Sequence, residues 1–428
     1  MVRRYLVAGA ASALATTMAI APARAEIPAC GPTITRSTVV PCALATSFAV
    51  HRERFAVAAA RGREATAGVI LPSNPQLSLS AGARTGDMGK SSVNWSAALA
   101  QEIEIAGQRG ARLAAARAEV DAQVKRAAMT EREAVAAAWI AYFDALWARD
   151  EVALAERLAR IAEGLAASAR SRAEQGLVAP LDADVAYAAS VRALQARAAA
   201  FRRFSGSRAA LAVAVGVDPS LPIQAEGDLV PLPVPDEAVA RLADKAVGAR
   251  AEIAIAKAEE HANERRASLL RRARVPNLTL SVSIANDGFN ERVITGGISL
   301  PIPLPSPLGR TNAGEIAEAT ALARRAGAEA ERLQRLIRLQ VMTASYSYAS
   351  RRRELDAFDA KQLARAEAGL RSLGEELAAG RLGARDALLA QQGLVELLQA
   401  HLEARRALCV ASVELARAVG VALDRGAR

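Results

Sequence analysis

The chain repeats itself over a distance of 204 residues. Gly176 and Gly380 are separated by that distance (380 − 176 = 204), and Val-Gly-Val triplets at 215–217 and 419–421 share it. A period this long exceeds that of solenoid repeats, and it indicates an internal duplication. The sequence therefore predicts a protomer built from two similar halves.

The N-terminus has the pattern of a secretory signal. Arg3 and Arg4 precede an apolar run over 6–20, and Ala23-Arg24-Ala25 supplies a small-x-small cleavage pattern. We predict a signal peptide over 1–25, with an uncleaved membrane anchor as the alternative. No later segment is long and apolar enough for a spanning helix, so any membrane-embedded part would have to be made of strands.

The composition favours long helices over a bulky globular core. Hydrophobic residues make up 52% of the chain but aromatic residues only 4%, and the excess is alanine among Arg and Glu. Small side chains of this kind allow long helices to pack closely. The net charge of +10 is spread along these segments without a dense basic block, which argues against nucleic-acid binding.

The first half is predicted to contain helices on either side of one β-hairpin. A helical stretch is predicted over 43–68, and the segment 71–75, which contains Pro72, breaks it. Alternating strands over 77–81 and 93–99 follow. The next segment, 109–174, lacks proline, so one helix could extend roughly 100 Å. After Gly176 and Pro180, a second long helix is predicted over 182–215.

A proline-rich linker over 219–235 separates the halves, and the second half repeats the first. It is predicted to hold helices and one hairpin, over 236–272 (helix), 278–284 and 293–300 (strands), 312–378 and 385–419 (helices). The predicted units are a signal peptide (1–25), an N-terminal periplasmic segment with the first helix (26–75), the first repeat (76–218), the linker (219–235) and the second repeat (236–428).

Four strands are too few to close a membrane barrel. The smallest barrels that fill their own interior have about eight strands. Each predicted strand is long enough to cross a bilayer when tilted, and apolar and small polar residues alternate along it. Three chains would supply twelve strands, so we expect a barrel shared by a trimer. A soluble sheet is the alternative.

Two cysteines lie close together after the signal. Cys30 and Cys42 could form a disulfide in an oxidising periplasm, which would leave Cys409 unpaired. Alternatively, residues 27–30 loosely resemble a lipobox, which would make Cys30 a lipidation site. Pro28 fits that cleavage poorly, and the disulfide is favoured.

No catalytic or cofactor-binding motif is present, so the chain is not expected to be an enzyme. The histidines, His51, His261 and His401, are far apart on amphipathic segments and are interpreted as solvated surface residues. Selective binding of a transition metal needs convergent imidazole or sulfur ligands, which this pattern does not provide. Neither a cofactor nor a protein-bound metal is predicted.

Three stretches resemble the TolC family of outer-membrane efflux channels, and within it the CzcC-like branch that serves heavy-metal pumps. They enter or leave the predicted hairpins at 71–77 (LPSNPQL), 101–109 (QEIEIAGQR) and 298–304 (ISLPIPL), and Asn312-Ala313-Gly314 opens the following helix as the family's Asn-x-Gly does. Gln108 stands where lysine is usual in that branch. The resemblance extends over nearly the whole mature chain.

The resemblance implies a mainly α protein with a membrane β-barrel: a TolC-like homotrimeric channel with four strands and long coiled helices per protomer. It would sit in the Gram-negative outer membrane, extend into the periplasm, and work with a periplasmic adaptor and an inner-membrane RND pump. The helix turns would form the periplasmic end. We expect them to contact the adaptor, because small apolar residues at an exposed turn need a partner; they are Gly176, Leu177, Val178, Ala179, Gly380, Leu382, Gly383 and Ala384.

Carboxylates near the turns are candidates for the pore constriction. Asp386 stands where the family has a gate aspartate, and Asp182 or Asp184 could supplement it. Leu389 occupies the position of a second family carboxylate, so this chain would have one acidic ring. A ring of carboxylates would favour cations. For Asp182 and Asp386, a helix N-cap is the alternative.

The leading functional hypothesis is a passive exit duct of a tripartite RND efflux system, carrying heavy-metal cations. Type I secretion and drug efflux use the same architecture and are the alternatives. A periplasmic coiled-coil scaffold would explain the long helices, but not the hairpins at matching places in both halves.

Overall fold

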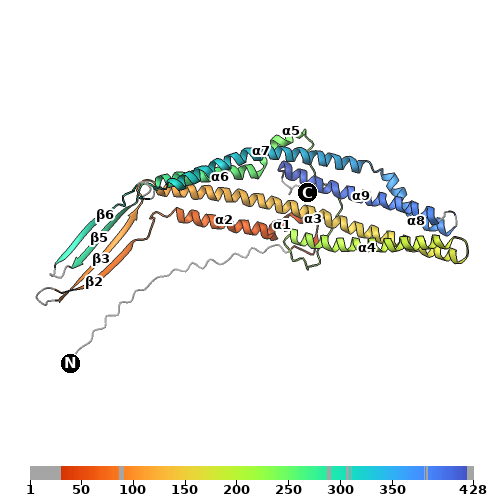
Figure 1. Ribbon diagram of the computed structural model, residues 1–428, viewed down its shortest axis with the longest axis horizontal. Coiled ribbons are helices and arrows are strands. Elements are labelled where there is room, and N and C mark those ends of the chain that lie inside the picture. Colours follow the sequence, from red (N-terminus) through yellow and green to blue (C-terminus); the bar gives the residue numbers. More distant parts are fainter. Residues whose placement is uncertain are drawn as a thin grey trace, which may run out of the picture.

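The computed structural model is a long rod with a sheet at one end and helices along the rest (Figure 1). It describes residues 30–85, 91–286, 291–304, 308–309, 311–379, 381 and 384–421. The predicted signal peptide, 1–25, lies outside the described residues.

The two predicted hairpins form, and they join into one antiparallel sheet. The strands are β2 (Gln76–Thr85), β3 (Ser91–Ile103), β5 (Leu278–Asn286) and β6 (Arg292–Ser299), in the order β2-β3-β5-β6. The halves meet where β3 pairs with β5, with Leu99 opposite Val282. The duplication thus appears in space as two hairpins side by side.

The sheet has one apolar face and one polar face. Residues opposite each other in antiparallel strands share a face, so the register places Leu77, Leu99, Val282 and Gly296 in one row, and Leu79, Ala97, Ile284 and Ile294 in the next. The other face carries mainly serine, threonine and alanine. Many apolar side chains are open to solvent in the single chain, and Ile298 is 73% exposed.

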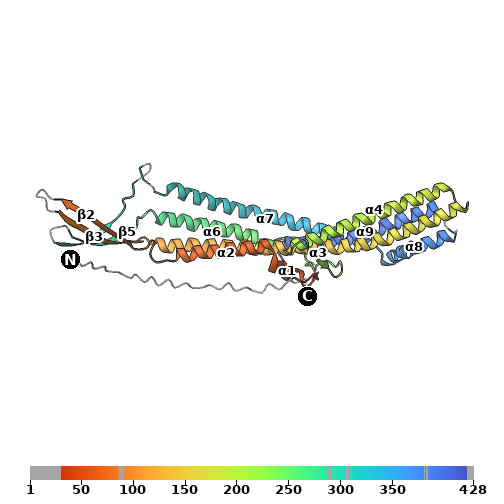
Figure 2. The ribbon, with the colours of Figure 1, turned by 90° about the horizontal axis from the view of Figure 1, so that it is seen from below.

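Four helices leave the sheet and run side by side (Figure 2). They are α2 (Phe48–Ala67), α3 (Gln108–Glu174), α6 (Ala251–Arg272) and α7 (Ala313–Asp356). Their buried positions are mostly alanines, for example Ala256 on α6 and Ala323 on α7. Alanine at these positions lets the helix axes approach closely, as the composition predicts.

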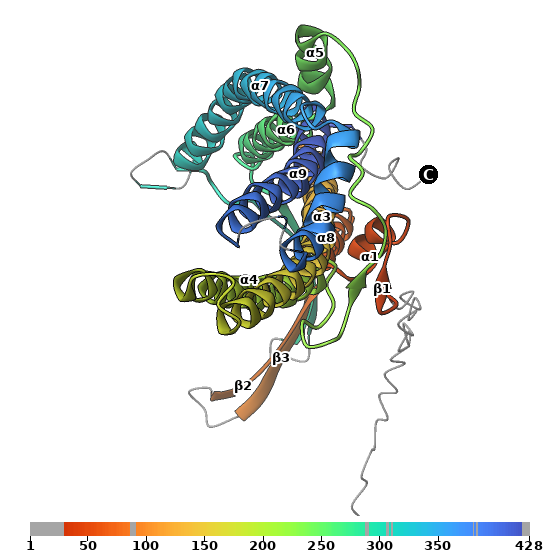
Figure 3. The ribbon, with the colours of Figure 1, turned by 90° about the vertical axis from the view of Figure 1, so that its right-hand side faces the viewer.

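The far end of the rod is a second bundle, made of the end of α3 with α4 (Pro180–Ala214), α8 (Ala360–Ala378) and α9 (Ala384–Val419). Leucines from α3, α8 and α9 pack together in it, including Leu158, Leu373 and Leu398. Seen along the rod, α4 and α7 lie on opposite sides with α3, α8 and α9 between them (Figure 3).

The middle of the rod is thickened by short elements. These are β1 (Thr33–Ile34), α1 (Val39–Thr46), β4 (Gln224–Ala225) and α5 (Val239–Ala249), and β1 pairs with β4 in parallel. Trp139, Tyr142 and Phe143 of α3 form the aromatic centre of this core. The proline-rich segment crosses the core and buries Leu229 and Leu232 in it.

Three predicted helices are interrupted. The stretch over 43–68 is two helices separated at Ser47, whose backbone is extended. The helix predicted over 236–272 breaks at Arg250, whose side chain pairs with Glu252 and donates to the Ala418 carbonyl at 3.2 Å. The helix predicted over 312–378 ends at Asp356 and restarts at Ala360. At Arg250, the side-chain contact with Ala418 of α9 accompanies the break.

The restart at Ala360 is capped by the side chain of Asp359. Asp359 Oδ1 accepts hydrogen bonds from the backbone N–H groups of Lys361 and Gln362, at 2.7 and 3.0 Å. An aspartate in this position satisfies first-turn donors that a continuous helix would bond internally.

Among the described residues, no helix is both long and apolar enough to cross a membrane.

Candidate functional site

The two helix turns lie at the same end of the rod, farthest from the sheet (Figure 1). One joins α3 to α4 over 175–179, and the other joins α8 to α9. The leucine cluster of α3, α8 and α9 lies behind them and fixes the helices relative to one another. The duplicated segments therefore form a single tip.

The first turn is closed by a glycine in the left-handed conformation. Gly176 has φ of 72°, and the Leu177 N–H donates to the Arg172 carbonyl at 2.8 Å. Pro180 then begins α4, where the missing N–H of proline has no helical acceptor to lose. Leu177 is 62% exposed, Val178 is half-buried and Ala179 is exposed. An apolar knob thus projects from the tip.

The second turn contains the equivalent backbone bond. The Arg381 N–H donates to the Glu376 carbonyl at 3.0 Å, and its guanidinium pairs with the Glu376 carboxylate at 2.7 Å. Ala384 begins α9. The other predicted contact residues of this turn, Gly380, Leu382 and Gly383, lie outside the described residues.

Two of the three predicted constriction carboxylates, Asp182 and Asp386, lie in the first turns of tip helices. Asp182 lies in the first turn of α4 and is half-buried, whereas Asp184 is exposed; Asp386 lies in the first turn of α9 and is exposed. Acidic side chains are stabilised there by the helix dipole. Asp182 is not the N-cap, because Ala179 holds that position and has no side-chain cap bond.

Leu389 is 62% exposed, one turn after Asp386 on α9. Residues three apart are neighbours on a helix surface, so Leu389 and Asp386 are exposed side by side at the start of α9.

The stretch that carried the family resemblance forms the joint between sheet and helices. The Glu102 carboxylate accepts from Ser73 Oγ at 3.2 Å and from Asn277 Nδ2 at 2.8 Å, which ties the two halves together. Glu104 pairs with Arg112, whose guanidinium also donates to the Ala67 and Val69 carbonyls. The motif therefore fixes the angle at which the sheet leaves the rod.

Gln108 is the central residue of this joint and is only 4% exposed. Its Oε1 accepts from the Ala106 N–H at 2.7 Å, while its Nε2 donates to the Val275 carbonyl at 3.0 Å and to Asn277 Oδ1 at 3.2 Å. A lysine could make the donor contacts but could not accept. The substitution of glutamine for lysine thus has a structural consequence that the sequence did not reveal.

The cysteines and two of the histidines occupy buried or half-buried positions. Cys30 and Cys42 form a disulfide with their Cα atoms 5.6 Å apart, so this Cys30 has no free thiol to carry a lipid. Cys409 is a free, buried thiol in the central core. His51 and His401 are half-buried and not the solvated residues that were expected, whereas His261 is exposed. The His401 ring lies 5.3 Å from that of Phe358, at the break between α7 and α8.

Within the described part of the chain, no three His, Cys, Asp or Glu residues are grouped so that they could hold a metal ion. His51 contacts the Ala45 carbonyl at 2.8 Å, and His261 accepts from Arg265 Nε at 3.0 Å.

Comparisons with known proteins agree with this architecture. Residues 40–217 match the family model described as outer membrane efflux protein. The chain is 29% identical over 261 residues to Protein CyaE of Bordetella pertussis (strain Tohama I), a match that takes in 57% of this chain and 55% of that protein. The chain thus spans about half the length of this curated relative.

Solved structures resemble the whole rod. CusC superposes with a TM-score of 0.73 at 18% identity, covering 90% of this chain and 92% of CusC. The outer membrane protein VceC of Vibrio cholerae gives 0.72 at 17% identity, covering 91% and 96%. The open-state MtrE outer membrane channel of Neisseria gonorrhoeae gives 0.72 at 18% identity, covering 92% and 90%. The chain therefore has the fold of these three proteins.

Proposed function

We propose that this chain is one protomer of an outer-membrane efflux channel. Three copies would each contribute four strands to a twelve-stranded barrel, and their helices would form a duct through the periplasm. The observation that carries this proposal is the sheet with one continuous apolar face at the end of a helical rod. The outer membrane efflux protein match and the channel fold support it.

The edges of the sheet favour a shared barrel. In the described chain, β2 and β6 are the outer strands, and each pairs on one side only. Unpaired backbone groups at a sheet edge are costly in lipid, so a membrane sheet has to close on itself. Pairing β6 of one copy with β2 of the next would satisfy both edges.

The tip is the proposed docking end for a periplasmic adaptor, which would link the duct to a proton-driven inner-membrane RND pump. Leu177 is exposed at a rigid turn, and an exposed apolar knob gains stability when a partner covers it. We expect Leu177→Glu to abolish efflux while the trimer still assembles. Gln175→Glu adds the same charge in the same turn without removing the knob, and it should retain efflux.

The proposed cargo is heavy-metal cations, on the basis of the CzcC-like stretch over 101–109. The protein would act as a passive duct, with the pump or the adaptor selecting the metal. A deletion strain should become sensitive to transition metals and not to dyes or detergents. Sensitivity to dyes and detergents alone, or a secretion defect, would instead favour one of the alternative ducts.

The assembly is tested by measuring mass in mild detergent after isolation of the outer-membrane fraction. The proposal predicts three chains per particle and recovery with the outer membrane. A stable monomer, or release of the protein by osmotic shock, would contradict the shared barrel.

A further inference from the structure

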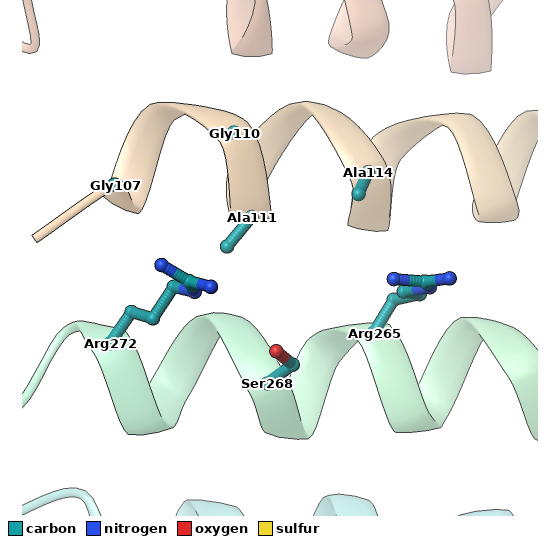
Figure 4. Close-up of a pocket in the computed structure, with 7 residues that line it drawn as sticks. All are labelled: Gly107, Gly110, Ala111, Ala114, Arg265, Ser268 and Arg272. Carbon is teal, nitrogen blue, oxygen red and sulfur yellow. The ribbon is translucent and has the colours of Figure 1, made fainter.

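A groove of about 230 Å³ lies between α3 and α6, close to the sheet. Arg265, Ser268 and Arg272 project into it from one face of α6, at spacings of three and four residues (Figure 4). The facing wall on α3 is made of glycine and alanine, including Gly107 and Ala111. The groove is therefore polar and cationic on one side and small-walled on the other.

Arg272 is held in position by the backbone of the sheet-to-helix joint. Its Nη1 donates to the Ala106 carbonyl at 3.0 Å. Gly107 has φ of 71°, and a Cβ atom there would lie 2.8 Å from Arg272 Nη1. A side chain at 107 would displace the guanidinium, so glycine keeps the space that Arg272 occupies. One N–H is used in this contact, and the guanidinium has other donors for a ligand.

The positive charge of the groove is not neutralised from within. None of the lining residues is acidic. Arg265 uses its Nε for a 3.0 Å hydrogen bond to His261 Nε2, and throughout the described residues neither Arg265 nor Arg272 has a carboxylate partner. Elsewhere on α6 and its neighbours such pairs do form, as between Arg126 and Glu259. Two guanidinium groups that lack a carboxylate partner, with a hydroxyl between them, match the oxygen atoms of a phosphate.

The groove lies where the sheet ends. Gly107 follows the last residue of β3, Ile103, by four positions, and Arg272 precedes the first residue of β5, Leu278, by six. These separations place the Arg272 end of the groove within roughly 20 Å of the start of β5, since an extended chain spans about 3.4 Å per residue. If the sheet crosses the membrane, the groove lies near the periplasmic headgroup layer.

We propose that the groove binds the phosphate group of an anionic phospholipid of the periplasmic leaflet. This inference rests on the proposed function, because that function places the sheet in the bilayer. A lipid held between α3 and α6 would tie the membrane boundary to the joint that carries Gln108 and Glu102. The same guanidinium groups would bind free phosphate more weakly, since it lacks the acyl chains beside the apolar face.

The test uses the full-length protein in nanodiscs of mixed phosphatidylglycerol and phosphatidylcholine, with native mass spectrometry to count retained lipid. The wild type should retain phosphatidylglycerol selectively. Arg265→Gln and Ser268→Glu should each lower its apparent affinity by about tenfold, as expected for losing a charge-assisted hydrogen bond or adding a repulsive charge. Arg266→Gln removes a neighbouring exposed charge from the same helix and should leave retention unchanged.

Equal losses in Arg265→Gln and Arg266→Gln, or no loss in either, would overturn the site. A parallel titration of detergent-solubilised protein with inorganic phosphate, followed by ³¹P line broadening, separates the two sources of phosphate. Phosphate binding that depends on Arg265 without selective lipid retention would show a free-anion site and overturn the lipid assignment. Failure to insert into nanodiscs would instead contradict the proposed function, and the phosphate titration would still test the groove.

Discussion

Gly216 and Gly420, which are 204 residues apart, end equivalent helices with the same left-handed turn. Their φ angles are 75° and 79°. In both turns the N–H of the following valine donates to the carbonyl five residues back, from Val217 to Ala212 at 2.8 Å and from Val421 to Ala416 at 3.0 Å. The duplication therefore conserves a helix-ending geometry as well as a pattern of residues, and glycine is required because other residues are strained there.

The two glycines differ in their surroundings, which predicts different responses to alanine. Gly420→Ala should cost about 1 kcal/mol, the cost of a left-handed backbone, because the nearest atom to the new Cβ would be Ala249 Cβ at 3.4 Å. Gly216→Ala would also collide with the Thr46 carbonyl and should cost about 1–3 kcal/mol more. Urea unfolding followed by helical circular dichroism measures both, and equal losses would contradict the predicted clash.

Gln108 provides a second stability test. Gln108→Leu would leave the half-buried Ala106 N–H and the Val275 carbonyl without this partner, and we expect a loss of about 1–3 kcal/mol. Gln108→Lys should cost less, because an ammonium group can still donate to Val275 and Asn277. Thermal unfolding compares the variants, with the exposed Gln195→Leu as the control. A loss of stability in Gln195→Leu as large as that in Gln108→Leu would contradict a stabilising role for the Gln108 hydrogen bonds.

Sequence reasoning located the elements whose ends are marked by local chemistry. Gly176 and Pro180 mark the turn between α3 and α4, and the alternation in both hairpins predicted strands that form as expected. It missed the breaks at Arg250 and at 357–359, because no proline marks them and the residues there also contact the distant helix α9, Arg250 through the Ala418 carbonyl and Phe358 through the His401 ring. For the same reason, the burial of Leu229 and Leu232 within the proline-rich segment could not be foreseen.

The candidate site was predictable to a similar extent. The sequence placed Asp182 and Asp386 next to duplicated turns, and both lie in first turns of tip helices. In the proposed trimer, what they face would depend on the other copies of the chain, which no periodicity encodes. The role of the 101–109 stretch in joining the two halves also required the structure, since Glu102 and Asn277 are 175 residues apart.

Cys409 should be unreactive in the native protein. Burial raises the pKa of its thiol to about 12, so the nucleophilic thiolate is scarce at neutral pH. A thiol-specific alkylating reagent should add no label to the native chain, one after unfolding, and three after unfolding and reduction of the Cys30–Cys42 disulfide. Labelling of the native protein at Cys409 would contradict its burial.

The same shift predicts a pH dependence. An unfolded cysteine ionises at a pKa of about 8.5, whereas Cys409 stays neutral in the fold until about 12. Its contribution to stability is therefore complete below the unfolded pKa and is lost as the pH rises between these values. Cys409→Ala should flatten the alkaline decline of the unfolding free energy. An unchanged slope would show that other groups cause the decline.

His401 should contribute to the loss of stability at acidic pH, whereas Cys409 contributes at alkaline pH. Burial, followed by the charge of Arg405, lowers the pKa of its imidazole below the ordinary value. The fold thus favours the neutral ring beside Phe358, and this contribution is present above the unfolded pKa of about 6.5 and is lost as the pH falls through the folded value. Urea unfolding at several pH values should show a smaller acid-side decline for His401→Gln than for the wild type. Parallel curves for the two proteins would contradict this role.

Asp386 should govern ion passage through the closed tip. Its carboxylate is exposed in the first turn of α9, and in the proposed trimer three copies would converge at the narrow end of the duct. Close carboxylates concentrate cations, most strongly at low salt, because the screening length is about 30 Å at 0.01 M but about 3 Å at 1 M. In planar-bilayer recordings, Asp386→Asn should lose cation selectivity at low salt, whereas Leu389→Asp should strengthen it and increase block by multivalent cations. Selectivity that is unchanged in Asp386→Asn would leave Asp386 with only its favourable place at the start of a helix.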